Sequence, residues 1–229
     1  MSSIKEEFDA LAAQYETNRL SPWYQAQGEE ILRQVPSLEE GDVLDIGCGT
    51  GYFLRQYLKN NPHIRGVGLD ISSKMVDEAN RKAKAEGVGN VKFITGDWED
   101  IDLKLLSPYR FKIIVCASSF HYYSNPQKAA CKLHELLDSQ GVLYILERDK
   151  TQSLLTLFWG VLHRYLIKDQ VAFYSSKELI KFLNNAGFGG VSVLRTIKRY
   201  FWKGKLFTSV ILIESYKTLK ATNGQSNIT

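Results

Sequence analysis

Short apolar runs rich in β-branched residues recur through the middle of the chain, and amphipathic helical patterns separate them. Five such runs predict strands, at residues 43–46, 66–69, 91–95, 111–117 and 141–146. Consecutive strands with a helix between them pair in parallel through right-handed crossovers. The pattern therefore predicts a parallel sheet that is buried on both faces.

Further helical patterns flank these strands. Two of them, over residues 4–15 and 23–35, precede the first strand, and one over residues 151–170 follows the fifth. The stretch 175–187 has a serine before its first turn, Glu178 at the second or third helical position and a glycine at its end. These are the cap residues of a helix that begins and stops within the stretch.

Two more strands are predicted near residues 191–199 and 206–216. Only the short link at 202–205 joins them, so they must pair as an antiparallel hairpin. The expected fold is α/β, with a doubly wound, seven-stranded mixed sheet and an antiparallel C-terminal hairpin.

The length of 229 residues fits one domain with an elaboration, since domains typically hold ~100–200 residues. We expect a single domain over 1–221 and a flexible polar tail over 222–229. Within the domain, residues 1–40 would form cap helices and 151–174 a helical lid insertion. The 44% hydrophobic content excludes the disordered class.

The three cysteines, Cys48, Cys116 and Cys131, form no C-x-x-C pair, so neither a disulfide framework nor a structural zinc site is indicated. A reducing, cytoplasmic compartment fits this usage. No apolar run approaches the ~18 residues that a membrane span needs, so we expect no transmembrane segment. One chain does not distinguish a monomer from a homodimer.

Charge is distributed unevenly along the chain, whose formal net charge is +4. Residues 1–100 hold 11 Lys and Arg against 17 Asp and Glu (11 − 17 = −6), which leaves 18 against 8 (18 − 8 = +10) for the remainder. RNA or an anionic membrane surface is therefore an alternative partner. The basic residues do not form the clustered stripe of a nucleic-acid-binding protein, so we expect no DNA partner and rank RNA below a small molecule.

A glycine-rich loop follows the first strand, in the sequence ValLeuAspIleGlyCysGlyThrGly at 43–51. Gly47, Gly49 and Gly51 allow positive φ and let a ligand approach the backbone and the N-terminus of the next helix. A plain tight turn is the alternative. The third glycine comes one residue too early for a dinucleotide fingerprint, and Asp45 beneath the loop suits a ligand with an ammonium group.

Acidic residues end the next two strands. Asp70 can accept hydrogen bonds from both hydroxyls of a ribose, although either Asp70 or Ser72 could instead cap the following helix. Asp97 in GlyAspTrp can accept from an adenine amino group while Trp98 flanks the ring; a turn aspartate beside a core tryptophan is the alternative.

Together, AspIleGlyCysGlyThrGly at 45–51, Asp70, GlyAspTrp at 96–98 and the mixed seven-stranded pattern resemble the class I S-adenosylmethionine-dependent methyltransferases, with their Rossmann-like fold. The resemblance spans about residues 40–216. The opening PheAspAlaLeuAlaAlaGlnTyrGlu at 8–16 resembles the ubiquinone/menaquinone-biosynthesis type of small-molecule methyltransferase. In that type the tyrosine, here Tyr15, closes over the cofactor.

The resemblance implies a cofactor, S-adenosylmethionine, and a product, S-adenosylhomocysteine. The glycine loop and its acid would hold the methionine end, Asp70 the ribose, and Asp97 the adenine. The residues implied to contact the cofactor are Tyr15, Asp45, Gly47, Cys48, Gly49, Gly51, Asp70, Ile71, Asp97, Trp98, Ala117 and Ser118.

The segment AlaSerSerPheHisTyrTyr at 117–123 follows the fourth strand, where members of the family meet the acceptor. It lacks the AsnProProTyr or AspProProTyr pattern of enzymes that methylate amino groups of bases. His121 could act as a general base or have a structural role. Tyr24 and Tyr122 could add aromatic contacts to the acceptor.

The stretch 154–167 is apolar almost all round and would form the lid. Phe158 and Trp159 are candidate walls for the acceptor, and His163 is a second candidate base. The alternatives are a helix packed on the body, a dimer contact or an interfacial membrane contact. Glu147 and Asp149 show no metal-ligand set, and a solvated ion pair with Arg148 or Lys150 accounts for them.

We therefore expect an S-adenosylmethionine-dependent methyltransferase that acts on O, N or C of a small, lipophilic or aromatic metabolite. An RNA or protein methyltransferase is one alternative, and a non-catalytic protein that binds the cofactor is another. The loop spacing and the final hairpin argue against a nicotinamide dehydrogenase.

Overall fold

The computed structural model describes residues 2–18, 21–150, 172–197, 201–202, 205–206 and 210–217. The helices of these residues are α1 (Ser2–Leu11), α2 (Ser21–Gln34), α3 (Tyr52–Asn60), α4 (Ser73–Ala85), α5 (Pro126–Leu136) and α7 (Ser176–Ala186), with 3₁₀ turns η1 (Ala12–Gln14), η2 (Leu103–Leu106) and η3 (Phe120–Tyr122). The strands are β1 (Asp42–Ile46), β2 (Arg65–Asp70), β3 (Val91–Thr95), β4 (Phe111–Ala117), β5 (Leu137–Arg148), β6 (Phe188–Ile197), β7 (Phe201–Trp202), β8 (Lys205–Leu206) and β9 (Val210–Lys217).

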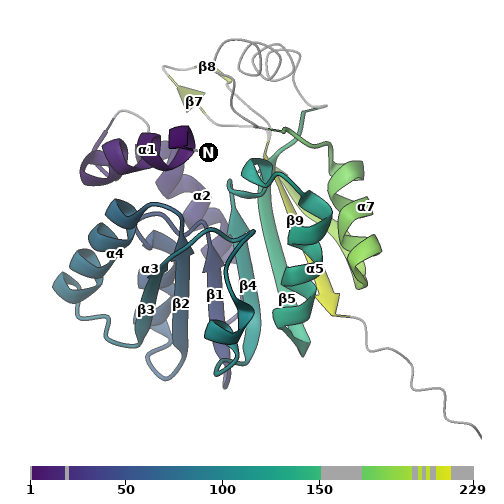
Figure 1. Cartoon of the computed structure of the whole chain (residues 1–229), viewed down its shortest axis with the longest axis horizontal. Coiled ribbons are helices and arrows are strands. Elements are labelled where there is room, and N and C mark those ends of the chain that lie inside the picture. Colours follow the sequence, from purple (N-terminus) through teal and green to yellow (C-terminus); the bar gives the residue numbers. More distant parts are fainter. Residues whose placement is uncertain are drawn as a thin grey trace, which may run out of the picture.

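Seven strands form one mixed sheet in the order β3-β2-β1-β4-β5-β9-β6 (Figure 1). The first five strands of the chain pair in parallel, and β9 pairs antiparallel with both β5 and β6. This confirms the predicted seven-stranded mixed sheet and the antiparallel C-terminal strands. All five parallel strands end at one edge, and Figure 1 shows α1 lying across that edge.

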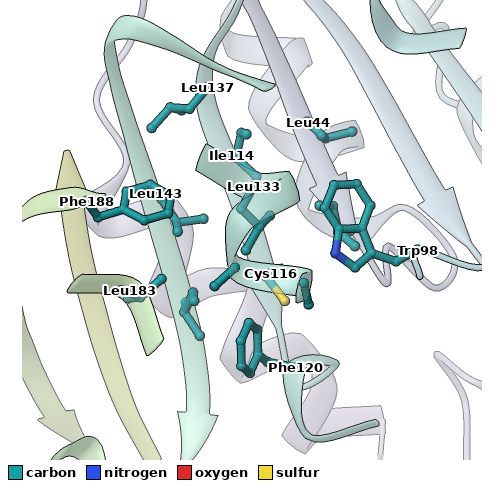
Figure 2. Packing of buried hydrophobic residues seen from close by; sticks show 14 of the residues in the cluster. Leu44, Trp98, Ile114, Cys116, Phe120, Leu133, Leu137, Leu143, Leu183 and Phe188 are labelled. Carbon is teal, nitrogen blue, oxygen red and sulfur yellow. The ribbon is translucent and has the colours of Figure 1, made fainter. Parts of the chain in front are cut away.

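The two faces of the sheet carry separate hydrophobic clusters because side chains alternate along each strand. Leu44 and Ile46 of β1 belong to a cluster with α5 and α7, whereas Val43 belongs to a cluster with α2, α3 and α4. Figure 2 shows the first cluster, in which Leu133 of α5 and Leu183 of α7 pack with the strand residues. The helices therefore cover both faces, as the runs of apolar residues predict.

The helix α7 has the caps that its sequence predicts. The Ser175 hydroxyl accepts from the backbone N–H of Glu178 at 3.3 Å, and the Glu178 carboxylate accepts from the N–H of Ser175 at 2.7 Å. Gly187 ends the helix with φ of 98°. This capping box fixes Glu178 at the third helical position.

Strand bounds differ from the predictions at the C-terminal side of the sheet. β5 begins at Leu137, four residues before the predicted apolar run. The apolar pattern missed these first residues because most of them are polar and partly exposed. Trp202 and Lys205, the two ends of the predicted short link, pair with each other in a separate two-stranded ribbon formed by β7 and β8. The apolar pattern did not separate β7 and β8 from the two longer strands β6 and β9, which pair with each other in the main sheet. None of the helices in the described residues is long and apolar enough to span a bilayer.

Candidate active site

A cavity of about 320 Å³ lies at the edge where the parallel strands end. The predicted site residues that line it are Tyr15, Tyr24, Asp45, Gly47, Cys48, Gly49, Asp70, Ile71, Asp97, Trp98, Ala117, Ser118, His121 and Tyr122. Gly51 is not among the lining residues. Phe158, Trp159 and His163, with most of the predicted lid, lie outside the described residues.

The glycine loop after β1 has the backbone that the sequence predicts. Gly47, Gly49 and Gly51 have φ of 71°, 53° and 72°, a region that side chains disfavour. A Cβ at Gly49 would lie 3.6 Å from the Tyr15 ring, and both residues line the cavity. A Cβ at Gly51 would come within 2.5 Å of Phe93, so this third glycine serves the packing of α3 against the sheet. A Cβ at Gly47 would come within 2.4 Å of Ser119, so of the three positions Gly49 has the most room on the cavity side.

Asp70 joins the end of β2 to this loop. Its carboxylate accepts from the N–H of Gly49 at 2.8 Å and from the N–H of Ser72 at 2.9 Å. The cap of α4 is Ser72, whose hydroxyl accepts from the N–H of Met75 at 3.1 Å. This decides between the two candidate caps. Burial raises the pKa of Asp70, and its oxygens keep lone pairs for a ligand, since a carboxylate has about four acceptor sites.

Asp45 lies buried beneath the loop, with its side chain among the cavity-lining groups. Burial and the neighbouring Asp70 carboxylate raise its pKa to about 8. Both effects oppose the charged form of an acid. A cationic ligand would relieve both, because it supplies an opposite charge where two carboxylates meet.

The third acid, Asp97, forms a turn and lines the cavity. Its Oδ1 accepts from the N–H of Glu99 at 2.9 Å, which orients the carboxylate. Trp98 belongs to the cluster in Figure 2 and is 3% exposed, yet it also lines the cavity. Asp97 thus lies in a turn and Trp98 packs in the core, as the two alternatives describe. Both residues also line the cavity, so these local contacts are compatible with a role in ligand binding.

The N-terminal segment packs over the cavity through polar contacts of Asp9 and Glu16. Asp9 of α1 accepts from the Ser72 hydroxyl at 2.6 Å. Glu16 accepts from the Thr50 hydroxyl and from the buried guanidinium of Arg55, both at 2.6 Å. These contacts hold α1 and η1 against the glycine loop and α4. Sequence reasoning missed them because they join residues more than 30 positions apart.

Between these contacts, Tyr15 stacks on Tyr24 of α2, with ring centroids 4.2 Å apart and planes at 18°. Both rings line the cavity. The stacked pair forms an aromatic wall of the cavity beside Gly49 of the glycine loop.

His121 and Glu147 form a buried pair on the other side of the cavity. The Nδ1 of His121 lies 2.8 Å from Oε2 of Glu147, and Oε1 of Glu147 accepts from the N–H of Phe120 at 2.8 Å. Glu147 is 2% exposed, so the expected solvated ion pair is wrong for this residue. Lys150 instead pairs with Glu178 at 2.6 Å. The interpretation failed because strand-end acids look alike in sequence whether buried or solvated.

Two residues that sequence reasoning missed also line the cavity. Gln27 of α2 accepts from the Ser118 hydroxyl at 2.6 Å, and Ser118 has a positive φ of 50°. Arg148 ends β5. A glutamine within a helix and an arginine at a strand end carry no motif, so only the fold identifies them as cavity residues. Among the described residues, no group of three or more His, Cys, Asp or Glu could hold a metal ion.

A family model described as "Methyltransferase domain" matches residues 38–187. A malonyl-[acyl-carrier protein] O-methyltransferase from Halalkalibacterium halodurans is 32% identical over 101 residues, 44% of this chain and 36% of that protein. A demethylmenaquinone methyltransferase from Thermotoga maritima is 29% identical over 173 residues, 72% of this chain and 69% of that protein. For four relatives the match covers only 36%, 54%, 56% and 47% of their length, so the chain spans about half of these curated proteins.

Among solved structures, the magnesium protoporphyrin IX methyltransferase of Synechocystis with bound SAH has a TM-score of 0.71 to this chain. The identity is 18%, and the superposition covers 95% of this chain and 99% of that one. At this identity the similarity establishes the fold.

Proposed function

Because the chain belongs to the family of S-adenosylmethionine-dependent methyltransferases that carries this methyltransferase domain, we propose that it methylates a small, lipophilic or aromatic metabolite at O, N or C. The observation that carries the proposal is the convergence of the glycine loop, Asp45, Asp70 and Asp97 on one cavity. The family match accounts for the cofactor, and the aromatic lining supports the acceptor class. The names of the relatives, which include a demethylmenaquinone methyltransferase, support an acceptor of metabolic origin.

The residues fit the cofactor's charge and shape. Gly49 leaves room against Tyr15, Asp45 and Asp70 supply negative charge beneath the loop, and Asp97 lies farther along the same edge. We assign the ammonium end to Asp45, the ribose hydroxyls to Asp70 and the adenine amino group to Asp97. An acid at the end of β2 is the usual acceptor for ribose hydroxyls in doubly wound sheets.

The bound cofactor supplies a methyl group that is already activated on a sulfonium. The chain therefore has to orient the acceptor in line with that methyl group and exclude water. Correct positioning alone is worth up to ~7–11 kcal/mol of the barrier. The stacked Tyr15 and Tyr24 rings, held over the strand ends by the Glu16 contacts, would perform this positioning.

His121 would serve an acceptor that must lose a proton. Its Nδ1 faces Glu147, so Nε2 is the ring nitrogen directed to a ligand in the cavity. For a hydroxyl acceptor, Nε2 would take the proton that the oxygen loses when it receives the activated methyl group that the cofactor would supply. Glu147 stabilises the imidazolium that results, as a buried carboxylate partner does for a histidine base.

The test couples binding to turnover. S-adenosylhomocysteine should bind the purified protein with micromolar affinity, and radiolabelled S-adenosylmethionine should methylate at least one member of a panel of phenols, quinols and aromatic acids. Cofactor binding without turnover on the whole panel, on RNA and on protein would contradict catalysis and favour the non-catalytic alternative.

A further inference from the structure

The charge of the cavity changes along its length. Six of its described lining residues are acidic, namely Glu7, Glu16, Asp45, Asp70, Asp97 and Glu99. Arg148 is the one lysine or arginine in the described lining. The acids suit a ligand with a sulfonium and an ammonium group. A guanidinium does not suit those cationic groups, and where it lines the cavity it favours an anionic group instead.

The strand order places Arg148 away from the cofactor acids. Asp97, Asp70 and the glycine loop follow β3, β2 and β1, whereas Arg148 ends β5, two strands beyond β1 on the opposite side. Neighbouring strands lie about 4.8 Å apart, so β5 lies roughly 10 Å from β1 at this edge. Between them ends β4, followed by Ser118 and His121. Arg148 thus lies on the acceptor side of His121.

The surroundings of Arg148 are aromatic. Its guanidinium lies 5.9 Å from the centroid of the Phe173 ring. Burial lowers the pKa of Arg148, and the nearby Tyr122, Glu147 and Tyr24 side chains oppose that shift. A planar guanidinium among aromatic rings favours a flat anion that accepts two parallel hydrogen bonds, as a carboxylate does.

Gln27 supplies a second, independent observation. The side chain is 4% exposed and lines the cavity, one helical turn after Tyr24. Its Oε1 accepts from Ser118, while its Nε2 is buried without a hydrogen-bond partner. Burying an unpaired amide donor costs about 1–3 kcal/mol. A ligand that accepts a hydrogen bond from Nε2 of Gln27 would remove this cost. The Ser118 contact places this donor over the end of β4, beside the end of β5.

We propose that the acceptor carries a carboxylate, which Arg148 binds through its guanidinium with the Gln27 amide as a second donor. This inference rests on the proposed methyltransferase function and narrows its acceptor to an aromatic or apolar body with an acidic group. Arg148 and Gln27 would then select the substrate, while His121 faces the reacting atom.

The test uses two probes of equal shape, 1-naphthoate and 1-naphthamide, titrated by saturation-transfer NMR and calorimetry with and without S-adenosylhomocysteine. The wild-type complex should bind naphthoate roughly tenfold or more tightly than naphthamide, the scale of a charge-assisted contact. Arg148→Gln should remove that preference, and Arg148→Lys should keep part of it. Gln27→Leu should weaken naphthoate binding by a smaller factor.

Affinity for S-adenosylhomocysteine separates the two proposals. It should stay within twofold in Arg148→Gln, in Gln27→Leu and in the surface control Arg81→Gln, whose side chain pairs with Glu78 on α4. Equal binding of both probes, or an equal loss of both in Arg148→Gln, would overturn the carboxylate subsite and leave the methyltransferase proposal intact. Reduced S-adenosylhomocysteine affinity in Arg148→Gln or in Gln27→Leu would show that the substituted residue contacts the cofactor and not the acceptor. Failure of wild-type protein to bind S-adenosylhomocysteine would contradict the function itself.

Discussion

Asp70 accepts a hydrogen bond of 2.8 Å from the backbone N–H of Gly49, so the end of β2 holds the glycine loop in place. One carboxylate therefore orders the loop and faces the cavity. Its two backbone contacts keep the side chain in one orientation before a ligand arrives. Preorganised acceptors of this kind bind without a further ordering cost.

Asp70→Ala should accordingly weaken S-adenosylhomocysteine binding by about 1.5–3 kcal/mol, the scale of lost hydrogen bonds to a charged group. Calorimetric titration measures this directly. Asp77→Ala, at an exposed position of the adjacent α4, is the matched control and should bind normally. Normal binding by Asp70→Ala would refute the assignment of the ribose to this residue.

Cofactor affinity should depend on pH through Asp45. The pKa of this acid is raised to about 8 in the free protein, and a cationic ligand favours its ionised form. Affinity should therefore rise from pH 6 to 8, with a proton released on binding. Titrations in buffers of different ionisation enthalpy detect that proton. Asp45→Asn should abolish this proton release. If the variant still releases the same number of protons, the proton comes from another group and not from Asp45.

The same shift predicts how stability depends on pH. Because the folded pKa of Asp45 lies above the unfolded value of 3.8, the folded protein binds more protons between these values. The contribution of Asp45 is full below pH 3.8 and is lost as pH rises toward 8. Without ligand, Asp45→Asn should gain stability relative to wild type as pH rises from 5 to 8, in urea unfolding. A constant difference over that range would contradict the raised pKa.

His121→Ala should retain S-adenosylhomocysteine binding and lose methyl transfer to hydroxyl acceptors, by about 10²–10⁴-fold if Nε2 is the base. Glu147 is a positioning residue, so Glu147→Gln should lower the rate with acceptors that must lose a proton, while the rate with acceptors that lose none and the cofactor affinity stay unchanged. Loss of cofactor binding in His121→Ala would show that the ring supports the cofactor side instead.

Glu16→Ala should destabilise the protein by about 1–3 kcal/mol, because Arg55 is 1% exposed and would lose one of its two carboxylate partners. Cofactor affinity should fall as well, since Glu16 holds the segment that carries Tyr15. Urea unfolding and calorimetry measure both effects. Glu29→Ala removes only an exposed ion pair with Arg33 and should change neither quantity beyond error.

The sequence predicts the parts of this protein that depend on local patterns. Runs such as residues 111–117 predict buried strands because both faces need apolar side chains, and Ser175 with Glu178 predicts the start of α7. The glycine loop and the three strand-end acids share one edge because parallel strands end together, so their convergence follows from the topology.

Contacts between distant segments could not be predicted in this way. Gln27 meets Ser118 across 91 positions, and Glu147 meets His121 across 26. None of these four residues has a sequence pattern that distinguishes it from a surface residue. Whether a strand-end Glu147 is solvated or buried depends on which loop covers it, and that is a property of tertiary packing.

The most direct test of the central claim is a calorimetric titration of the wild-type protein with S-adenosylmethionine, S-adenosylhomocysteine and NADH. The first two ligands should bind with micromolar affinity and a stoichiometry near one, and NADH should not bind. Binding of NADH with comparable affinity, or no binding of either S-adenosyl ligand, would contradict this claim.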